Sequence, residues 1–270
     1  MDQIILPNKV EYQSDPENKN KGQFIIEPCY PGYGTTWGNA LRRVLLSSLP
    51  GAAVDSIKIS GGRHEFSTLP HIKEDILQIV LNFKQLRLKL FKDEPVKLKL
   101  SVKGEKKVTA ADITKSADVE IANPDLHLAT LTDKKAEFEV EINVSKGFGY
   151  VPSEEKDRTG LEIGTIVMDS TFSPITKVAT QIEKMRVGQR TDYDRLSLII
   201  ETDGTIAPYQ AFMEAADLLN SQFGFLSTQS RAVAEQLSLA EEKSIAKKPK
   251  TKKKVIKKKT TKIAKSKSKK

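Results

Sequence analysis

The sequence of 270 residues predicts an α+β fold, because helical and strand-like apolar patterns occupy separate stretches of the chain. Three segments repeat apolar residues every three to four positions, which predicts helices over 36–48, over 71–84 and from Pro208 onward. In other stretches apolar and polar residues alternate, as in antiparallel strands with one solvated face. A chain of this length can bury one large core or two modest ones.

The first predicted helix, residues 36–48, has a clear beginning, end and core face. Thr35 and Thr36 suit the N-cap position, and Pro50 followed by Gly51 is a typical stop signal. At about 100° per residue, one stripe of the helix should face the core. The residues of this stripe are Trp37, Leu41, Val44, Leu45 and Ser48.

The opposite face of this helix carries an apolar residue where water is expected. Leu46 stands there between Arg42 and Arg43, with Leu49 nearby. Arginine suits a partly buried interface, since its planar fork can pair with a carboxylate while its stem packs on apolar surface. The pattern therefore favours a surface for assembly, and the plainer alternative is two surface arginines beside one stray leucine.

Strands are predicted on both sides of this helix, over 23–27 and 53–59. The second helix, 71–84, follows Pro70 and repeats apolar residues at Ile72, Ile76, Ile79, Val80 and Phe83. Alternation then predicts strands along the apolar series Leu86, Leu88, Leu90; Val96, Leu98, Leu100, Val102; Phe138, Val140, Ile142, Val144; and Leu196, Leu198, Ile200. Residues 52–172 should therefore be mostly antiparallel sheet.

The last predicted helix begins at Pro208, where proline is favourable because its missing N–H would have no partner. One stripe carries Phe212, Ala215, Leu219, Phe223 and Leu226, and Ala211 and Leu218 widen it. Gly224 is expected to mark a bend or an early end. This apolar surface is wider than a small sheet needs, so the pattern predicts that a second copy of the chain covers the rest.

The net charge of +9 conceals a division of the chain. Residues 243–270 hold 15 lysines and no acidic residue, so residues 1–242 carry 29 basic against 35 acidic residues, or −6. The Lys-rich tail has almost nothing to form a core and is expected to be disordered. No apolar run approaches about 18 residues and no secretion signal opens the chain, which predicts a soluble cytoplasmic protein without membrane contact.

No residue pattern indicates a catalytic, metal or cofactor site. Three glycines, Gly32, Gly34 and Gly38, have the wrong spacing for a dinucleotide-binding loop and are assigned to a tight turn before the helix. The histidines are too scattered for a zinc site, and the adjacent pairs 74–75 and 154–155 are expected to be solvated surface. Cys29, the only cysteine, cannot form an intramolecular disulfide and is expected to be half-buried at a strand end.

Several motifs closely resemble the alpha subunit of bacterial DNA-directed RNA polymerase. The longest spans residues 32–54, and the others follow in the family's order: 64–68, 74–76, 81–84, 108–113, 149–152, 169–170, 172–174, 187–194 and 202–206. The resemblance covers roughly residues 8–230. It implies a discontinuous dimerisation domain, 1–51 with 173–235, and an inserted, mainly β domain, 52–172; residues 236–270 remain as the disordered tail.

The resemblance also implies partners and contact residues. It implies a homodimer that binds the beta and beta-prime subunits, with omega, sigma and DNA in the assembled enzyme. Arg43 and Leu46 match positions that contact beta. Lys84 and Met168 match positions implicated in contact with beta-prime, and the loop carrying Arg190, Asp192 and Arg195 lies in the same region. The expected dimer residues are Trp37, Leu41, Val44, Leu45, Phe212, Leu219 and Phe223.

The sequence departs from this family at two places. Trp37 stands where the family usually has an aliphatic residue, and the chain ends in lysines where most alpha subunits continue into a helical DNA-binding domain. The tail is therefore hypothesised to contact DNA non-specifically, through Lys252, Lys253, Lys254, Lys257, Lys258 and Lys259. A membrane-surface role and plain solubilising disorder are the alternatives.

The leading functional prediction is a non-catalytic, cofactor-free scaffold subunit of the polymerase, working at the nucleoid in the assembled enzyme. A free-standing nucleic-acid-binding protein is the first alternative, but such proteins usually carry basic charge on the fold itself, whereas residues 1–242 are acidic. An independent enzyme is the second, and it lacks any convergent set of acid, base, nucleophile or metal ligands.

Overall fold

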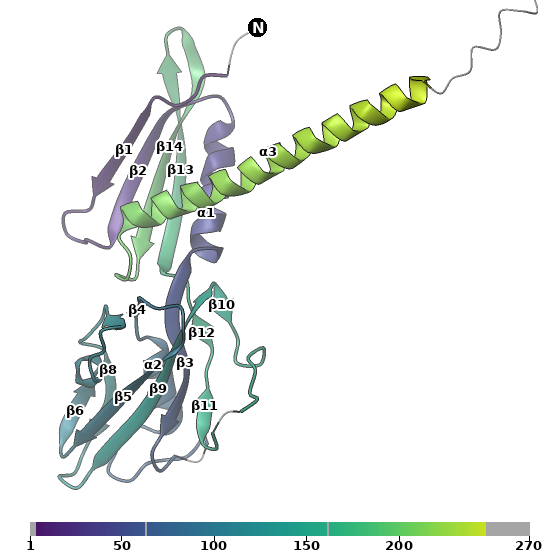
Figure 1. The fold of residues 1–270 in the computed structure, drawn as a ribbon. Coiled ribbons are helices and arrows are strands. Elements are labelled where there is room, and N and C mark those ends of the chain that lie inside the picture. The colour runs from purple at the N-terminus through teal and green to yellow at the C-terminus, as the bar shows by residue number, and fades with distance from the viewer. Residues whose placement is uncertain (1–3, 63, 161, 247–270) are drawn as a thin grey trace, which may run out of the picture. The chain divides into compact units, whose positions relative to one another are not determined.

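The structure is a computed structural model that describes residues 4–62, 64–160 and 162–246 (Figure 1). In these ranges it contains three α-helices, one 3₁₀ helix and fourteen strands, all paired strands being antiparallel, which confirms the α+β prediction. The chain divides into two units, 1–219 and 220–270, and each is described by itself.

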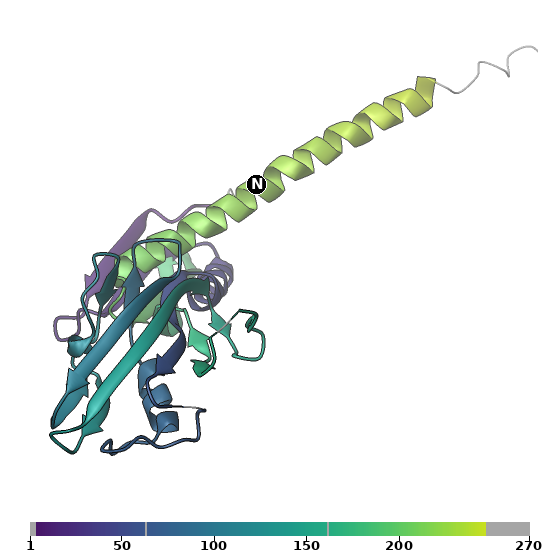
Figure 2. The same cartoon turned by 60° about the horizontal axis from the view of Figure 1, so that its bottom comes forward.

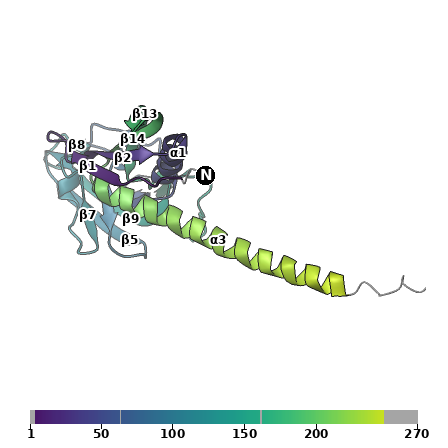
Figure 3. The same ribbon diagram turned by 90° about the horizontal axis from the view of Figure 1, so that it is seen from above.

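A four-stranded sheet joins the two ends of the first unit. Its order is β1 (Lys9–Ser14), β2 (Lys21–Cys29), β14 (Arg190–Thr202) and β13 (Ile175–Val187), which Figure 3 shows from above. In its register Phe24 lies opposite Leu198 and Ile26 opposite Leu196, so these buried side chains share one face. Strand pairing thus brings segments about 170 residues apart into one layer.

Helix α1 (Tyr33–Ser47) packs on this face of the sheet. Gly38 permits the close approach, because a Cβ there would lie 3.1 Å from Leu196 Cδ1. The helix begins three residues before the predicted start. Gly32, with φ +86°, turns the chain into it, so Thr35 and Thr36 lie in the first turn instead of capping it, and Gly34 and Gly38 belong to the helix and not to a preceding turn.

Helix α3 (Pro208–Ala246) begins on the same apolar face. Phe212 stacks on Phe24, with ring centroids 4.0 Å apart and planes at 14°, and Ala211 and Ala215 are fully buried. The second unit carries the helix onward from Asn220. The bend or end expected at Gly224 is wrong, because one glycine costs a helix only about 1 kcal/mol and the flanking residues sustain it.

A larger sheet forms from the middle of the chain (Figure 2). Its strand order is β5 (Val96–Lys103), β9 (Glu137–Phe148), β3 (Pro50–Ile59), β4 (Leu88–Leu90) and β7 (Val119–Ile121), and β11 (Thr165–Val167) also pairs with β3. Smaller ladders join β6 (Lys106–Thr109) to β8 (His127–Leu131) and β10 (Tyr150–Val151) to β12 (Ser170–Thr171); a 3₁₀ helix, η1, spans Ala110–Asp112.

Helix α2 (Ile76–Lys84) is shorter than the predicted segment 71–84. Asp75 caps it, accepting a 2.8 Å hydrogen bond from the Gln78 N–H. His71 has φ +63°, and Ile72 forms a β-bridge with Leu131, so the preceding residues pair with the β8 region instead of starting the helix. A long-range pairing therefore decides where this helix begins.

Two hydrophobic cores support these layers. One lies around the larger sheet, with Phe83, Leu100, Phe138 and Ile142 almost fully buried; the other lies beneath α1 and the start of α3. The second contains Leu45, Leu196 and also Cys29, which is fully buried, not half-buried as expected. The predicted domain boundaries stay a prediction, because both cores lie in the first unit.

Candidate interaction surfaces

The outer face of α1 places two arginines and one leucine at the surface. Arg42 and Arg43 are exposed and Leu46 is 36% exposed, while Leu41 and Leu45 point into the core. Leu49, expected near the outer face, is instead only 2% exposed, because the chain has already turned toward β3. Among the described residues, neither guanidinium has an ion-pair partner. The face therefore offers two cations beside an apolar side chain.

The N-terminus of α1 is capped by a carboxylate from β14. Asp194, 1% exposed, accepts a 2.9 Å hydrogen bond from the Gly32 N–H, and Lys184 donates to it at 2.6 Å. Burial opposes ionisation, but these bonds and the Gly34 N–H outweigh it and hold the pKa of Asp194 below its ordinary value. Because residue 194 is 162 positions from Gly32, sequence reasoning could not find this cap.

The segment from Arg190 to Arg195, predicted as a loop, is instead the start of strand β14, because it pairs with β13 directly after a tight turn at Gly188. Arg190 donates to both carboxylate oxygens of Asp192, at 3.1 and 2.8 Å, and lies over the rings of Tyr30 and Tyr193. Both charged residues are exposed. The guanidinium is therefore positioned by a carboxylate and two aromatic rings before any partner binds.

Arg195 lies on the side of β14 that faces away from the Leu196 core. It donates to Glu27 on β2, which also accepts from Lys9 at 3.2 Å. These hydrogen bonds, first that of Arg195, keep the pKa of Glu27 below its ordinary value. Part of the hydrogen-bonding capacity of Arg195 is therefore used by Glu27 of the same chain.

Lys84 and Asp169 form an ion pair that links α2 to the segment before β12. The ammonium and carboxylate are 2.9 Å apart, and the second oxygen of Asp169 accepts from the Ser153 N–H at 2.9 Å. Hydrogen bonds from Lys84, Ser153 and Tyr150 hold the pKa of Asp169 well below its usual range. The structure therefore presents Lys84 in a defined position.

Met168, predicted with Lys84 as a beta-prime contact, lies in the core of the larger sheet. Its side chain is 3% exposed, so it offers almost no surface to a partner. The main chain around it is held by Lys156, which donates to the carbonyl of Met168 at 2.5 Å, to Ser170 Oγ at 2.6 Å and to the carboxylate of Asp55 at 2.7 Å. Lys156 is a residue that sequence reasoning missed, because its partners lie in two segments more than 100 residues apart, β3 and residues 168–170.

The apolar stripe expected at a dimer interface is covered to different degrees. Leu41 and Leu45 are 7% and 0% exposed and fill the chain's own core, leaving little surface for a second copy. Partial burial leaves surface at Trp37, Val44, Phe212 and Leu219. In the second unit Phe223 is 62% exposed, as is Phe225, and Leu226 is 59% exposed.

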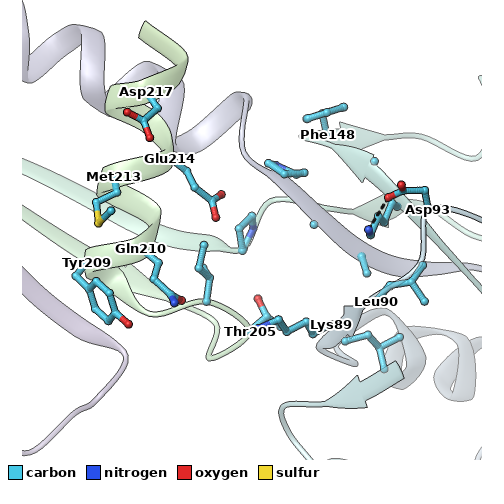
Figure 4. A pocket seen from close by; sticks show the side chains of 18 residues that line it. Lys89, Leu90, Asp93, Phe148, Thr205, Tyr209, Gln210, Met213, Glu214 and Asp217 are labelled. Carbon is cyan, nitrogen blue, oxygen red and sulfur yellow. Dashed lines mark hydrogen bonds and ion pairs between the residues drawn. The ribbon is translucent and has the colours of Figure 1, made fainter. Parts of the chain in front are cut away.

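A groove of about 800 Å³ lies between the start of α3 and strands β3, β4 and β9 (Figure 4). Leu90, Phe148, Tyr209 and Met213 give it apolar walls, and Glu214 and Asp217 border it. Asp93 pairs with Lys146 at 2.7 Å on its far side. The groove was not predicted, because its walls come from distant segments.

The remaining titratable clusters have structural partners. Glu74, expected on the solvated surface, is 9% exposed and accepts from the Thr130 N–H at 2.7 Å and from Thr130 Oγ1 at 2.8 Å, with His127 Nε2 at 3.1 Å. The expectation was wrong because residues 71–73 pair with the β8 region before α2 begins, which places the Glu74 side chain against Thr130. His71 lies 3.4 Å from Asp133. Within the described ranges, no group of three or more His, Cys, Asp or Glu side chains could hold a metal ion.

Two further predictions concern the tail lysines and the absence of a membrane-spanning helix. The tail lysines, Lys252, Lys253, Lys254, Lys257, Lys258 and Lys259, lie outside the described residues. Over the helices that are described, none is both long and apolar enough to cross a membrane.

Comparison with known proteins points to one family. The family model described as RNA polymerase Rpb3/RpoA insert domain matches residues 57–173. Three relatives are each named DNA-directed RNA polymerase subunit alpha. The relative from Symbiobacterium thermophilum is 53% identical over 78% of this chain and 67% of its own length. The relative from Alkaliphilus oremlandii is 47% identical over 82% of this chain and 69% of its own length. The relative from Alkaliphilus metalliredigens is 45% identical over 84% of this chain and 72% of its own length.

Proposed function

This chain belongs to the family of DNA-directed RNA polymerase alpha subunits, and from that premise we propose that it is the non-catalytic scaffold on which the polymerase assembles. Membership of the family gives it a role in DNA-directed transcription as part of a nucleotidyltransferase complex. In the proposal two copies dimerise and then bind the beta and beta-prime subunits. Catalytic residues are supplied by those other subunits.

The observation that carries the proposal is the outer face of α1. Arg43 is exposed and Leu46 is 36% exposed, on a helix whose other face is held in the core. Covering Leu46 would gain part of the roughly 1.5–3 kcal/mol that full burial of a leucine contributes, and Arg43 could add a bidentate pair with a carboxylate. We assign this face to the beta subunit.

A second copy of the chain would cover the apolar surface of α1 and α3. The proposed contacts are Trp37, Val44, Phe212, Leu219 and Phe223, which keep surface available, whereas Leu41 and Leu45 support the interface from inside the core. Four or five large apolar residues from each copy could exceed the cost of association. Trp37 contributes more area than an aliphatic residue would.

Beta-prime is assigned to Lys84 and to the start of β14, which carries Arg190, Asp192 and Arg195. Lys84 is held by Asp169 at 2.9 Å and Arg190 by Asp192 at 2.8 Å, so both cations are ordered before binding. An ordered side chain loses less conformational entropy on association than a mobile one. Met168 acts in the proposal only through the main chain next to Asp169.

Omega, sigma and DNA are further partners of the assembled enzyme, which works in the cytoplasm at the nucleoid. The Lys-rich tail is proposed to contact DNA phosphates non-specifically. If about six lysines do so, affinity falls about a thousandfold between 50 and 200 mM salt. Deleting residues 243–270 should flatten the salt dependence of DNA binding by the assembled enzyme, and an unchanged slope would refute the tail hypothesis.

The scaffold proposal is tested by co-expressing the tagged chain with beta. Arg43→Ala should dimerise normally but retain at least about tenfold less beta than wild type. The matched control is Arg158→Ala, which removes the same charge from an exposed loop and should leave retention unchanged. Retention of beta by Arg43→Ala at the wild-type level would reject the assignment.

A further inference from the structure

Helix α2 carries apolar residues on two faces, and the described part of the chain covers only one of them. Ile76, Ile79 and Phe83 are fully buried against the core of the larger sheet. Leu77 and Leu81 lie four positions apart on the outer side, 41% and 51% exposed. A helix that is apolar on both sides is normally buried on both. The outer stripe therefore has the character of an interface.

The stripe runs directly into the surface around Lys84. Lys84 follows Leu81 by three positions, so the two side chains are neighbours on the helix. Its ammonium lies 5.6 Å from the centre of the Tyr150 ring, which is 55% exposed. Two leucines, a lysine and a tyrosine thus form one continuous surface.

At the charged end of this surface, Lys84 and Asp169 determine which hydrogen bonds a partner can form. Both oxygens of Asp169 already have partners within the chain: Lys84, the Ser153 N–H and the Tyr150 side chain. The Lys84 side chain is 33% exposed, and an ammonium has three donors, of which Asp169 takes one. The hydrogen-bonding capacity left for a partner is therefore mainly that of a donor, which matches a carboxylate or carbonyl oxygen.

We infer that Leu77 and Leu81 belong to the same docking surface as Lys84, and that its occupant is an apolar segment of the beta-prime subunit with a hydrogen-bond acceptor beside the lysine. The inference rests on the proposed function, which places beta-prime at Lys84. Continuity with that surface favours beta-prime over a second copy, because the proposed dimer residues lie on α1 and α3 and none on α2.

The test is the affinity of beta-prime for the preformed complex of this chain with beta. The variant is Leu77→Ala with Leu81→Ala, because alanine keeps the helix propensity of α2 high. We expect its dissociation constant to rise at least about tenfold, as for the loss of two half-exposed leucine contacts. Gln78→Ala is the control, since Gln78 is exposed on the same helix beside the stripe. Thermal unfolding of the isolated subunit checks the fold, and single Leu81→Gln replaces the double variant if that check fails.

The outcomes separate this inference from the proposed function. A dissociation constant within twofold of wild type for the leucine variant, with Lys84→Ala still weakening binding, overturns the inference and leaves the proposed function intact. A loss of affinity for the leucine variant but not for Lys84→Ala supports the apolar surface and rejects the lysine assignment. Weaker dimerisation of the leucine variant in the absence of beta and beta-prime would mean that this surface binds the second copy of the chain. That result would overturn the inference.

Discussion

Replacing Asp194 should destabilise the subunit through helix α1, although the residue lies on a strand. The carboxylate is 1% exposed and accepts from the Gly32 N–H at 2.9 Å and from Lys184 at 2.6 Å. Loss of a charged acceptor costs about 1.5–3 kcal/mol, a value that includes the loss of the helix cap. Lys184 adds less than about 1 kcal/mol, because its side chain is 64% exposed. Asp194→Ala should therefore lower the free energy of unfolding by about 1.5–4 kcal/mol.

Urea denaturation, with the protein concentration held the same for every variant, measures this change in the free energy of unfolding. Asp192→Ala is the control, because it removes an exposed carboxylate two positions away and should cost less than about 1 kcal/mol. The folded-state pKa of Asp194 is lowered, so its contribution is present above the unfolded pKa, about 3.9, and is lost as pH falls through the folded pKa. The difference between wild type and Asp194→Asn should consequently shrink below about pH 4. Equal free energies of unfolding for Asp194→Ala and wild type at pH 7 would show that the carboxylate does not stabilise α1.

Three other predictions concern a glycine, a buried lysine and the second unit. Gly51→Ala should cost about 3 kcal/mol in urea unfolding, because its Cβ would lie 1.8 Å from the carbonyl oxygen of Phe172; Gly224→Ala, with open space around it, should instead stabilise the helix by up to about 1 kcal/mol. Lys156→Met should speed trypsin cleavage after Arg158 severalfold, because it removes the bonds to Met168 and Ser170, and an unchanged cleavage rate would contradict this anchoring role. Phe223→Ser should raise the dimer dissociation constant about tenfold in sedimentation experiments. Phe66→Ser, at a phenylalanine 73% exposed against 62% for Phe223, should leave it unchanged.

Local patterns in the sequence predicted the helices and most strands, because periodicity depends on neighbouring residues. They misplaced the starts of α1 and α2, since both depend on distant partners. Asp194 caps α1 from β14, and the β-bridge between Ile72 and Leu131 keeps the chain extended before α2. The pairing of β2 with β14 was equally invisible to periodicity, and only the family resemblance implied that the chain ends share a domain.

The sequence predicted a candidate surface only where all of its residues lie on a single helix. Arg43 and Leu46 are three positions apart, so their shared face follows from helix geometry alone. The ion pair of Lys84 with Asp169 joins residues 85 positions apart, and the carbonyl that Lys156 binds belongs to the loop before β12. The burial of Met168 and Glu74 likewise depends on packing between segments, which a linear pattern does not contain.

The decisive measurement for the proposed scaffold role is the stoichiometry of the complex that this chain forms with beta. Purified chain and purified beta, mixed without beta-prime, can be weighed together by native mass spectrometry. We expect a complex of two copies of this chain with one beta, and Arg43→Ala should leave only a free dimer. A complex of one copy with one beta, or a dimer that never binds beta, would contradict the proposed scaffold role.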